Sequence, residues 1–225
     1  MLDSLVEAEN IAKTYDGGEA PEVLRDISCR VLPGDRIAVA GPSGSGKSTL
    51  LHILAGLTAP SRGTVTWPLL GIRDVLMPAR VQVVFQSPSL FPPLDVADNI
   101  ALPLLLAGRG EGARAKAMDL LARFGIEELA TKLPEELSGG QAQRVSMARA
   151  LSIAPEMVLA DEPTGQLDSA TAQRFLDTVF EIAAEAGTAL VLATHDPAVA
   201  GRMSRVWMID HGSLFVRSQS DGETA

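Results

Sequence analysis

Short apolar runs recur along the chain and predict the strands of a buried sheet. They are residues 36–41 (RIAVAG), 81–85 (VQVVF), 157–161 (MVLAD) and 189–194 (ALVLAT). Nearly continuous hydrophobic runs of this length are typical of parallel strands that are covered on both faces. Residues 5–13 (LVEAENIAK) instead alternate hydrophobic and polar positions, which predicts a half-buried strand near the N-terminus.

A helical period explains most of the other hydrophobic positions. Residues 47–57 follow the strand at 36–41 and carry leucines at helical spacing. Residues 170–187 predict an amphipathic helix that Gly187 ends, with one face formed by Phe175, Val179, Ile182 and Ala183. Residues 114–125 predict another helix ending in glycine. Between about Leu94 and Leu151 strand patterns vanish and helical ones dominate.

These elements predict one α/β domain over residues 1–225, with a mostly parallel sheet and an antiparallel β region near the N-terminus. A helical subdomain is inserted into this core. The parts are the core at 1–93 and 152–216, the helical subdomain at about 94–151, and a polar tail at 217–225. Residues 108–114 (GRGEGAR) predict a flexible loop, and residues 205–216 predict two strands joined at His211–Gly212.

Composition narrows the class of protein. With 225 residues, 46% of them hydrophobic, the chain can bury one sizeable core. A net charge of -9 argues against nucleic acid as a partner, since that needs a basic face. The single cysteine, Cys29, excludes an internal disulfide and lies in an apolar-alternating stretch, which indicates a small core residue.

The N-terminus lacks the basic and apolar regions of a signal peptide. No stretch reaches the roughly 18 to 20 apolar residues that span a bilayer. We therefore expect a cytoplasmic protein, and any work at a membrane would need a partner that supplies the span.

Residues 41–49 (GPSGSGKST) match the phosphate-binding pattern G-x-x-x-x-G-K-[ST] between an expected strand and an expected helix. Such a loop is rich in glycine because its backbone N–H groups turn inward onto an anion, to which the helix adds its positive end. Lys47 would neutralise phosphate oxygens and the Ser48 hydroxyl would ligate Mg²⁺. A chance surface match is disfavoured by this context. The expected nucleotide contacts are Gly41, Pro42, Ser43, Gly44, Ser45, Gly46, Lys47, Ser48 and Thr49.

Polar residues end three of the other expected strands. Asp161 and Glu162 follow one apolar run, where one carboxylate can organise Mg²⁺ and the other can polarise an attacking water as general base. His195 ends another strand, and its neutral imidazole could reach the γ-phosphate and that base. Gln86 ends a third strand and could touch Mg²⁺ or the water. For each of these residues, a surface cap or a purely structural role is the alternative interpretation. His52 and His211 have no such context and are interpreted as structural.

A second glycine loop, residues 137–141 (LSGGQ), lies far from the first and contains no lysine. It can be interpreted as a helix N-cap with a glycine turn, or as a second phosphate-facing loop with a helix from Gln141 aimed at the anion.

In their order, the motifs GPSGSGKST, FQ, LSGGQ, LADEP, LD and THD resemble the ATP-binding subunit of an ATP-binding cassette (ABC) transporter, from Tyr15 to about Val216. The resemblance implies an ATP- and Mg²⁺-dependent ATPase on a P-loop NTPase core. It further implies that two copies pair head to tail, each second loop capping the ATP that the partner's lysine loop holds. The residues of that cap would be Ser138, Gly139, Gly140 and Gln141.

The resemblance also assigns roles by position. It implies that Tyr15 stacks on adenine and that Asp168 communicates between the two sites of the dimer. Asp161, Gln86 and Ser48 would hold the metal. Glu162 would be the catalytic carboxylate, with His195, Gln86 and Lys47 acting beside it. An integral membrane permease would be the second partner, with the ATPase peripheral on the inner face of the cell membrane.

Residues 161–169 (DEPTGQLDS) are similar to a bacterial group that includes lipoprotein-release, macrolide-efflux and cell-division ATPases. An importer-type ATPase is the alternative within the family. Outside it, a soluble ATPase acting on ribosomes or DNA ends would need a second cassette or a coiled coil, and a small-molecule kinase would leave LSGGQ unexplained. The apolar stretch from Leu90 to Leu106 is open to two interpretations, a wall where the membrane partner docks or the core of the helical lobe.

Overall fold

A six-stranded sheet forms the centre of the computed structural model, which describes residues 4–15, 21–77 and 79–218. The strand order is β5-β6-β7-β3-β8-β9, in which the first five run parallel and β9 is antiparallel to β8. The bounds are β3 (Arg36–Ala40), β5 (Val81–Val84), β6 (Met157–Asp161), β7 (Ala189–Thr194), β8 (Arg205–Asp210) and β9 (Ser213–Ser218). The apolar runs in the sequence therefore predicted the parallel strands correctly.

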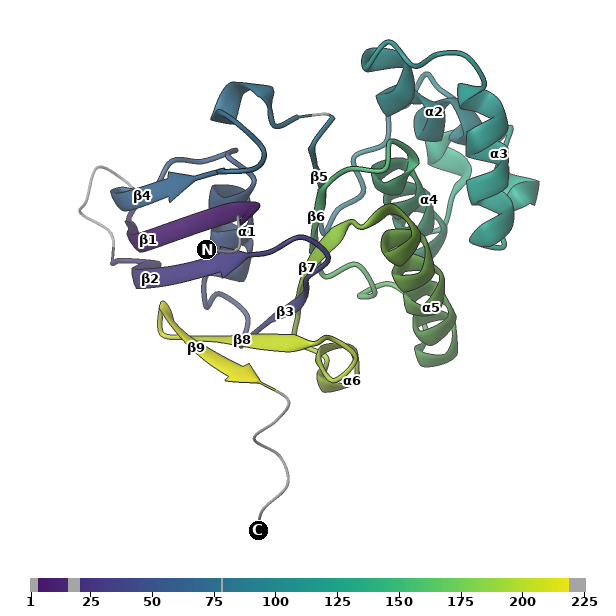
Figure 1. Ribbon diagram of the computed structural model, residues 1–225. Helices are drawn as coiled ribbons and strands as arrows, with labels where there is room; N and C mark the ends of the chain where they lie inside the picture. Colours follow the sequence, from purple (N-terminus) through teal and green to yellow (C-terminus); the bar gives the residue numbers. More distant parts are fainter. Residues whose placement is uncertain (1–3, 16–20, 78, 219–225) are drawn as a thin grey trace.

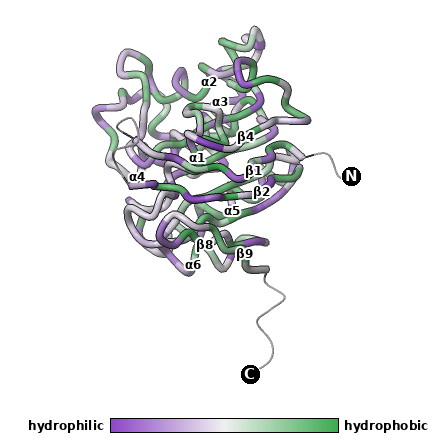
Figure 2. The backbone as a smooth tube through the Cα atoms, turned by 90° about the vertical axis from the view of Figure 1, so that its left-hand side faces the viewer, coloured by the Kyte–Doolittle hydropathy of each residue, from purple (hydrophilic) through white to green (hydrophobic). Residues whose placement is uncertain are grey.

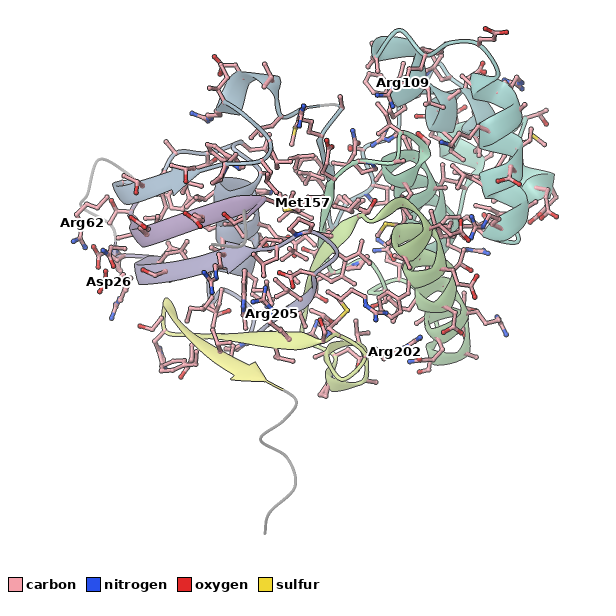
Figure 3. The ribbon with its side chains drawn as sticks, in the orientation of Figure 1. Asp26, Arg62, Arg109, Met157, Arg202 and Arg205 are labelled. Atoms are coloured by element: carbon pink, nitrogen blue, oxygen red, sulfur yellow. The ribbon has the colours of Figure 1, made fainter. Side chains whose placement is uncertain are left out.

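Both faces of the sheet are buried at its central strands β6, β7 and β3, which explains why these strands do not alternate with polar residues. On β3, Ile37 and Val39 pack into one core while Ala38 packs into the other. The same division holds on β6, where Met157, labelled near the middle of Figure 3, faces the core on the side of α1 (Lys47–Leu54). Removing these core residues from water stabilises the fold by about 25 cal/mol for each Å² of apolar surface that is buried.

A three-stranded antiparallel sheet lies beyond α1, as expected near the N-terminus. Its order is β2-β1-β4, with β1 (Val6–Lys13), β2 (Leu24–Val31) and β4 (Arg62–Thr66). Figure 2 shows these strands one above another on the near side, with hydrophilic and hydrophobic stretches mixed. Helix α1 contacts β6 and β7 of the central sheet and β1 of this one, so it fills the space between the two sheets.

The helices between β5 and β6 form a lobe on the opposite side of the central sheet from β1, β2 and β4 (Figure 1). They are α2 (Val96–Leu106), α3 (Ala113–Arg123), the 3₁₀ turns η3 (Glu127–Leu129) and η4 (Pro134–Glu136), and α4 (Gly139–Ser152). A further 3₁₀ turn, η2 (Arg73–Val75), lies between β4 and β5. The expected start of α4 at Gln141 was wrong by two residues, because Ser138 caps the helix and Gly139 begins it.

Two more helices flank the central sheet beside this lobe, α5 (Ser169–Ala186) and the short α6 (Pro197–Ala200). Gly187 ends α5 in the left-handed region at φ 69°, as its sequence predicted. Arg202, labelled beside α6 in Figure 3, pairs with Asp177 of α5 at 2.5 Å and lies over the ring of Phe180. These contacts hold α6 against α5.

The stretch from Leu90 to Leu106 contributes to the core of the helical lobe, one of its two expected roles, and also exposes large apolar side chains. Val96, Ile100 and Leu104 are buried in the core of the lobe, whereas Phe91 and Leu106 are exposed. The fully buried amide of Asn99 accepts a hydrogen bond from the Phe91 N–H at 2.8 Å and donates to the carbonyls of Phe91, Leu94 and Asp95. One polar side chain therefore fixes the loop that leads into α2.

Three expectations from the sequence, for residues 108–114, for Cys29 and for the polar tail, differ from the structure or lie partly outside the described residues. Of the expected loop at 108–114, residues 108–112 connect α2 and α3, whereas Ala113 and Arg114 already belong to α3, and Arg109 lies near the top of the lobe in Figure 3. Cys29 is only partly buried at the edge of the core, rather than inside it. Residues 219–225 of the expected polar tail lie outside the described residues. None of the helices in the described part of the chain has both the length and the apolar character to cross a membrane.

Candidate functional site

The residues that sequence patterns singled out at strand ends meet at one edge of the central sheet. Because β3, β5, β6 and β7 are parallel, their carboxyl ends lie at the same edge. Ala40 pairs with Thr194, Ala193 pairs with Asp161, and Ala160 pairs with Val84. The segments that begin with Gly41, Glu162, His195 and Phe85 therefore leave the sheet side by side. Ligand sites of open α/β sheets form at this edge.

The loop from Gly41 to Thr49 connects β3 to α1 and has the geometry of an anion cradle. Gly46 caps α1 at φ 105°, and a Cβ there would lie 2.6 Å from a Leu24 methyl. The Lys47 side chain folds back into the loop and donates to the carbonyls of Gly41 at 2.9 Å and Pro42 at 3.0 Å. Lys47 is only 7% exposed, and the ion pairs among the described residues do not include it, so an incoming anion would neutralise a buried charge.

Glu162 and His195 are in direct polar contact. His195 Nδ1 lies 2.9 Å from Glu162 Oε1, with the carboxylate largely buried and the imidazole largely exposed. Asp161, the residue before, is buried at the end of β6. Gln86 is exposed just after β5. Carboxylate, imidazole and amide are thus gathered at the sheet edge beside Lys47.

The backbone of Glu162 is strained, with φ at 48° in the left-handed region. Such a conformation costs about 1–3 kcal/mol in a residue other than glycine and persists only where neighbours hold it. Its N–H donates to Ala193 of β7 at 2.9 Å, while its carbonyl accepts from Gly165 N–H at 3.1 Å and from Gln143 Nε2 at 3.0 Å. Each such bond contributes about 0.5–1.5 kcal/mol, so together they can offset the strain.

The second glycine loop begins α4. Ser138 Oγ accepts from the Gln141 N–H at 3.3 Å, and Gln141 Oε1 accepts from the Ser138 N–H at 2.8 Å. This reciprocal pair is a capping box, so the N-cap interpretation of the loop is confirmed. Because the helix starts here, its first free N–H groups point out of the same end, and capping does not exclude an anion.

The LSGGQ loop lines its own hollow of about 340 Å³, which none of the residues from Gly41 to Thr49 lines. The opposite wall of the hollow is Gln166, Leu167 and Asp168. A Cβ at Gly140 would lie 2.9 Å from the Gln166 carbonyl oxygen, so glycine permits this close approach. Asp168 caps α5 by accepting from the Thr171 N–H at 3.0 Å. The chain therefore contains two glycine loops that line separate hollows.

Tyr15 lies beside the first loop, where its hydroxyl is 3.3 Å from Thr49 Oγ1. The ring is 43% exposed, and Lys13 Nζ lies 5.2 Å from its centroid. An exposed aromatic ring next to the start of α1 is placed where a base could stack on it.

Sequence patterns missed the buried polar residues that support these groups. Gln143 is 2% exposed and bridges Glu162 O to the Gln166 N–H. Arg149 of α4 and Asn99 of α2 hold the loop after Gln86. The only sign of these supporting residues in the sequence was a polar side chain among the apolar positions of a helix.

A phosphate cradle with a buried lysine, a strand-end carboxylate pair and a second capped glycine loop on a helical lobe together define a P-loop ATPase of the cassette class. The chain belongs to the ABC transporter family, whose model matches residues 24–165. The chain is thus an ATP-hydrolysing, nucleotide-binding subunit of this family.

Individual relatives agree over nearly the whole chain. The lipoprotein-releasing system ATP-binding protein LolD of Legionella pneumophila (strain Lens) is 42% identical over 96% of this chain and all of its own length. LolD of Shewanella oneidensis is 39% identical over 96% of this chain and 98% of its own length.

Solved structures show the same fold. A dimeric post-hydrolysis state of the ATP-binding cassette MJ0796 bound to ADP and Pi superposes with a TM-score of 0.86 at 33% identity, covering 95% of this chain and 98% of that chain. A second dimeric MJ0796 structure, a bacterial ABC transporter cassette, gives 0.87 at the same identity and coverage. The predicted P-loop core, parallel sheet and helical subdomain are thereby confirmed.

Proposed function

We propose that this chain drives a transporter of the lipoprotein-releasing type, pairing head to tail with a second copy around two ATP molecules. A separate integral membrane permease would supply the membrane span, and the ATPase would act at the inner face of the cell membrane. The relatives named for lipoprotein release support this type over an importer. The dimeric state of the related cassettes supports the pairing.

One observation carries the proposal: the LSGGQ loop and the lysine loop of one chain line different cavities. Pro42, Ser43, Gly44 and Ser45 line one hollow and Ser138 to Gln141 line another. Neither loop alone can surround a triphosphate. Two copies arranged head to tail would bring each LSGGQ loop onto the nucleotide held by the other copy.

The nucleotide would be held by the first loop. The N–H groups from Gly41 to Thr49 would cradle the phosphates, and Lys47 would exchange its carbonyl partners for phosphate oxygens. Tyr15 would stack on the adenine. The partner's Ser138, Gly139, Gly140 and Gln141 would cap the γ-phosphate, with Asp168 at the rim of the same hollow.

The donor set at the sheet edge also fits Mg²⁺, which prefers oxygen ligands and keeps several waters. The Ser48 hydroxyl, the Gln86 amide oxygen and the buried Asp161 carboxylate supply such ligands. The ion would neutralise charge on the phosphates. No cluster of three His, Cys, Asp or Glu ligands occurs among the described residues, in keeping with a metal shared with a nucleotide.

Glu162 would act as the general base for the attacking water. Its carboxylate is oriented by His195 at 2.9 Å and its backbone by strands β6 and β7. Gln86 would hold the water or the metal from the opposite side. A positioned general base contributes about 10²–10⁴-fold to a rate.

The permease would dock beside the loop that follows Gln86. Phe91 is exposed on that loop, Phe85 is exposed directly before Gln86, and Leu105 and Leu106 are exposed at the end of α2. Large apolar side chains gathered in this way mark interaction sites. Binding there would act directly on the loop that presents Gln86.

The decisive experiment uses Glu162→Gln, which removes the base but keeps the size of the side chain. ATP binding should remain, hydrolysis should fall by about 10²-fold or more, and ATP should convert the variant to a stable dimer in light scattering. A variant that stays monomeric with ATP and hydrolyses it at the parent rate would refute both the pairing and the role of Glu162. Copurification from detergent-solubilised membranes tests the permease.

A further inference from the structure

Gln143 of α4 bridges the two ends of the turn that carries Glu162. Its Nε2 donates to the Glu162 carbonyl at 3.0 Å and its Oε1 accepts from the Gln166 N–H at 3.1 Å. A carbonyl can only accept and an N–H can only donate, so these two partners fix the orientation of the amide. The side chain is almost wholly buried, and both bonds are therefore shielded from water.

Glu162 depends on such support because its backbone is in the left-handed region. Its N–H is held by β7 and its carbonyl by Gly165 of the same turn. Among the hydrogen bonds of the described residues, the one from Gln143 Nε2 connects the Glu162 carbonyl to the helical lobe. Loss of that bond would let the peptide rotate, and the carboxylate would move with it.

The same turn also touches the LSGGQ loop. Gln166 lies against Gly139 and Gly140, and Ser138 to Gln141 share a hollow with Gln166 to Asp168. Helix α4 therefore begins at the LSGGQ loop and, through Gln143, contacts the backbone of Glu162.

We propose that Gln143 is a positioning residue for Glu162, which transmits the state of a chain's own LSGGQ loop to its own general base. The inference rests on the proposed function, in which LSGGQ caps the nucleotide of the second copy while Glu162 serves the nucleotide of its own chain. When the second copy's nucleotide engages Ser138, α4 becomes fixed, and Gln143 then fixes Glu162. The two hydrolysis sites of the dimer are thereby linked within each chain.

The test is Gln143→Met, which keeps the length and burial of an unbranched side chain but removes both hydrogen bonds. The kcat for ATP should fall by about tenfold or more with KM unchanged, because displacing a catalytic group by about 1 Å can cost 10²-fold. In the Glu162→Gln background, Gln143→Met should still form the ATP-dependent dimer at the same ATP concentration. Gln173→Met on α5 is the matched control and should leave kcat as in the parent.

A parent-like kcat in folded Gln143→Met, or a raised KM with kcat unchanged, would overturn the inference. So would a folded double variant that fails to dimerise while Glu162→Gln alone dimerises, since Gln143 would then serve the LSGGQ loop instead. If Glu162→Gln alone does not dimerise, the proposed function fails, and the kcat–KM split of Gln143→Met still decides this inference.

A second variant covers the case in which Gln143→Met does not fold. Gln143→Glu keeps an acceptor for the Gln166 N–H, but an ionised carboxylate cannot donate to the Glu162 carbonyl. It should lose kcat at least tenfold, and a folded Gln143→Glu with parent kcat would overturn the inference.

Discussion

Arg149 on α4 donates hydrogen bonds to the Ser89 carbonyl at 2.9 Å and to the Ser89 hydroxyl at 3.3 Å. Burial lowers the pKa of this guanidinium from its ordinary value. Both acceptors lie on the loop between Gln86 and α2. The helix that begins with the LSGGQ loop therefore holds the segment on which we place the permease.

We expect Arg149→Met to lower the free energy of unfolding by about 2 kcal/mol, the scale of hydrogen bonds to a charged group. Ser89→Ala should cost less than about 1 kcal/mol, because the backbone carbonyl remains as acceptor. Urea unfolding of both variants measures the difference. Equal stabilities would mean that the Arg149–Ser89 contact does not hold the loop.

The contact between His195 and Glu162 leads to a second prediction. His195→Ala should reduce kcat by about 10²-fold with little change in nucleotide binding, because the Glu162 carboxylate loses the partner that orients it. Steady-state hydrolysis and equilibrium ATP binding check this. His211→Asn is the control, since His211 is in the left-handed region that Asn tolerates. Parent-like turnover in His195→Ala would mean that hydrolysis does not depend on the contact between His195 and Glu162.

The sequence predicted the strand, glycine loop and helix around Lys47 because the signals for that unit are local. Asp161, Glu162 and His195 were also predictable, since Asp161 ends an apolar strand and Glu162 and His195 each directly follow one. Strand β4 was not foreseen, because most of its residues are exposed and it has no apolar face. Gln143 and Arg149 were missed because their partners, 19 and 60 residues away, are brought close only by tertiary packing.

Tyr15 tests where the base of the nucleotide lies. Tyr15→Ala should weaken ATP affinity by about 1 kcal/mol or slightly more, the scale of base–aromatic stacking. Tyr15→Phe should bind like the parent, because it keeps the ring and loses only the contact with Thr49. Titration with ATP in the Glu162→Gln background avoids turnover. Unchanged affinity in the alanine variant would mean that adenine binds away from Tyr15.

Cys29 provides a prediction on pH. Desolvation by burial raises the pKa of its thiol from 9.0 to about 12, although the charge of Arg205 acts in the opposite direction. The thiolate is the reactive form, so at pH 9 the native chain should react with a thiol reagent at least about 10²-fold more slowly than the denatured chain. Because the pKa of Cys29 is higher in the folded chain than in the unfolded one, its protonated thiol contributes fully to the free energy of unfolding below pH 9.0. This contribution is lost as the pH rises towards 12. Equal labelling rates in both states would contradict this.

The two glycines of the LSGGQ loop should differ in their tolerance of alanine. A Cβ at Gly140 would lie 2.9 Å from both the Gln166 carbonyl oxygen and a Leu167 methyl, whereas at Gly139 it would meet only the Gln166 side chain, which can turn aside. Alanine gains up to about 1 kcal/mol in helix propensity over glycine at either position. At Gly140 the backbone clash, at about 1–3 kcal/mol, should exceed that gain.

Gly140→Ala should therefore lower the free energy of unfolding, while Gly139→Ala should leave it nearly unchanged. Chemical denaturation of the two variants is the measurement. In the Glu162→Gln background, Gly140→Ala should also raise the ATP concentration needed for dimerisation, because the displaced turn at Gln166 lines the hollow on which we propose that the second copy's nucleotide binds. If Gly139→Ala proved the more damaging to stability, the packing of Gln166 on this loop would differ from the one described.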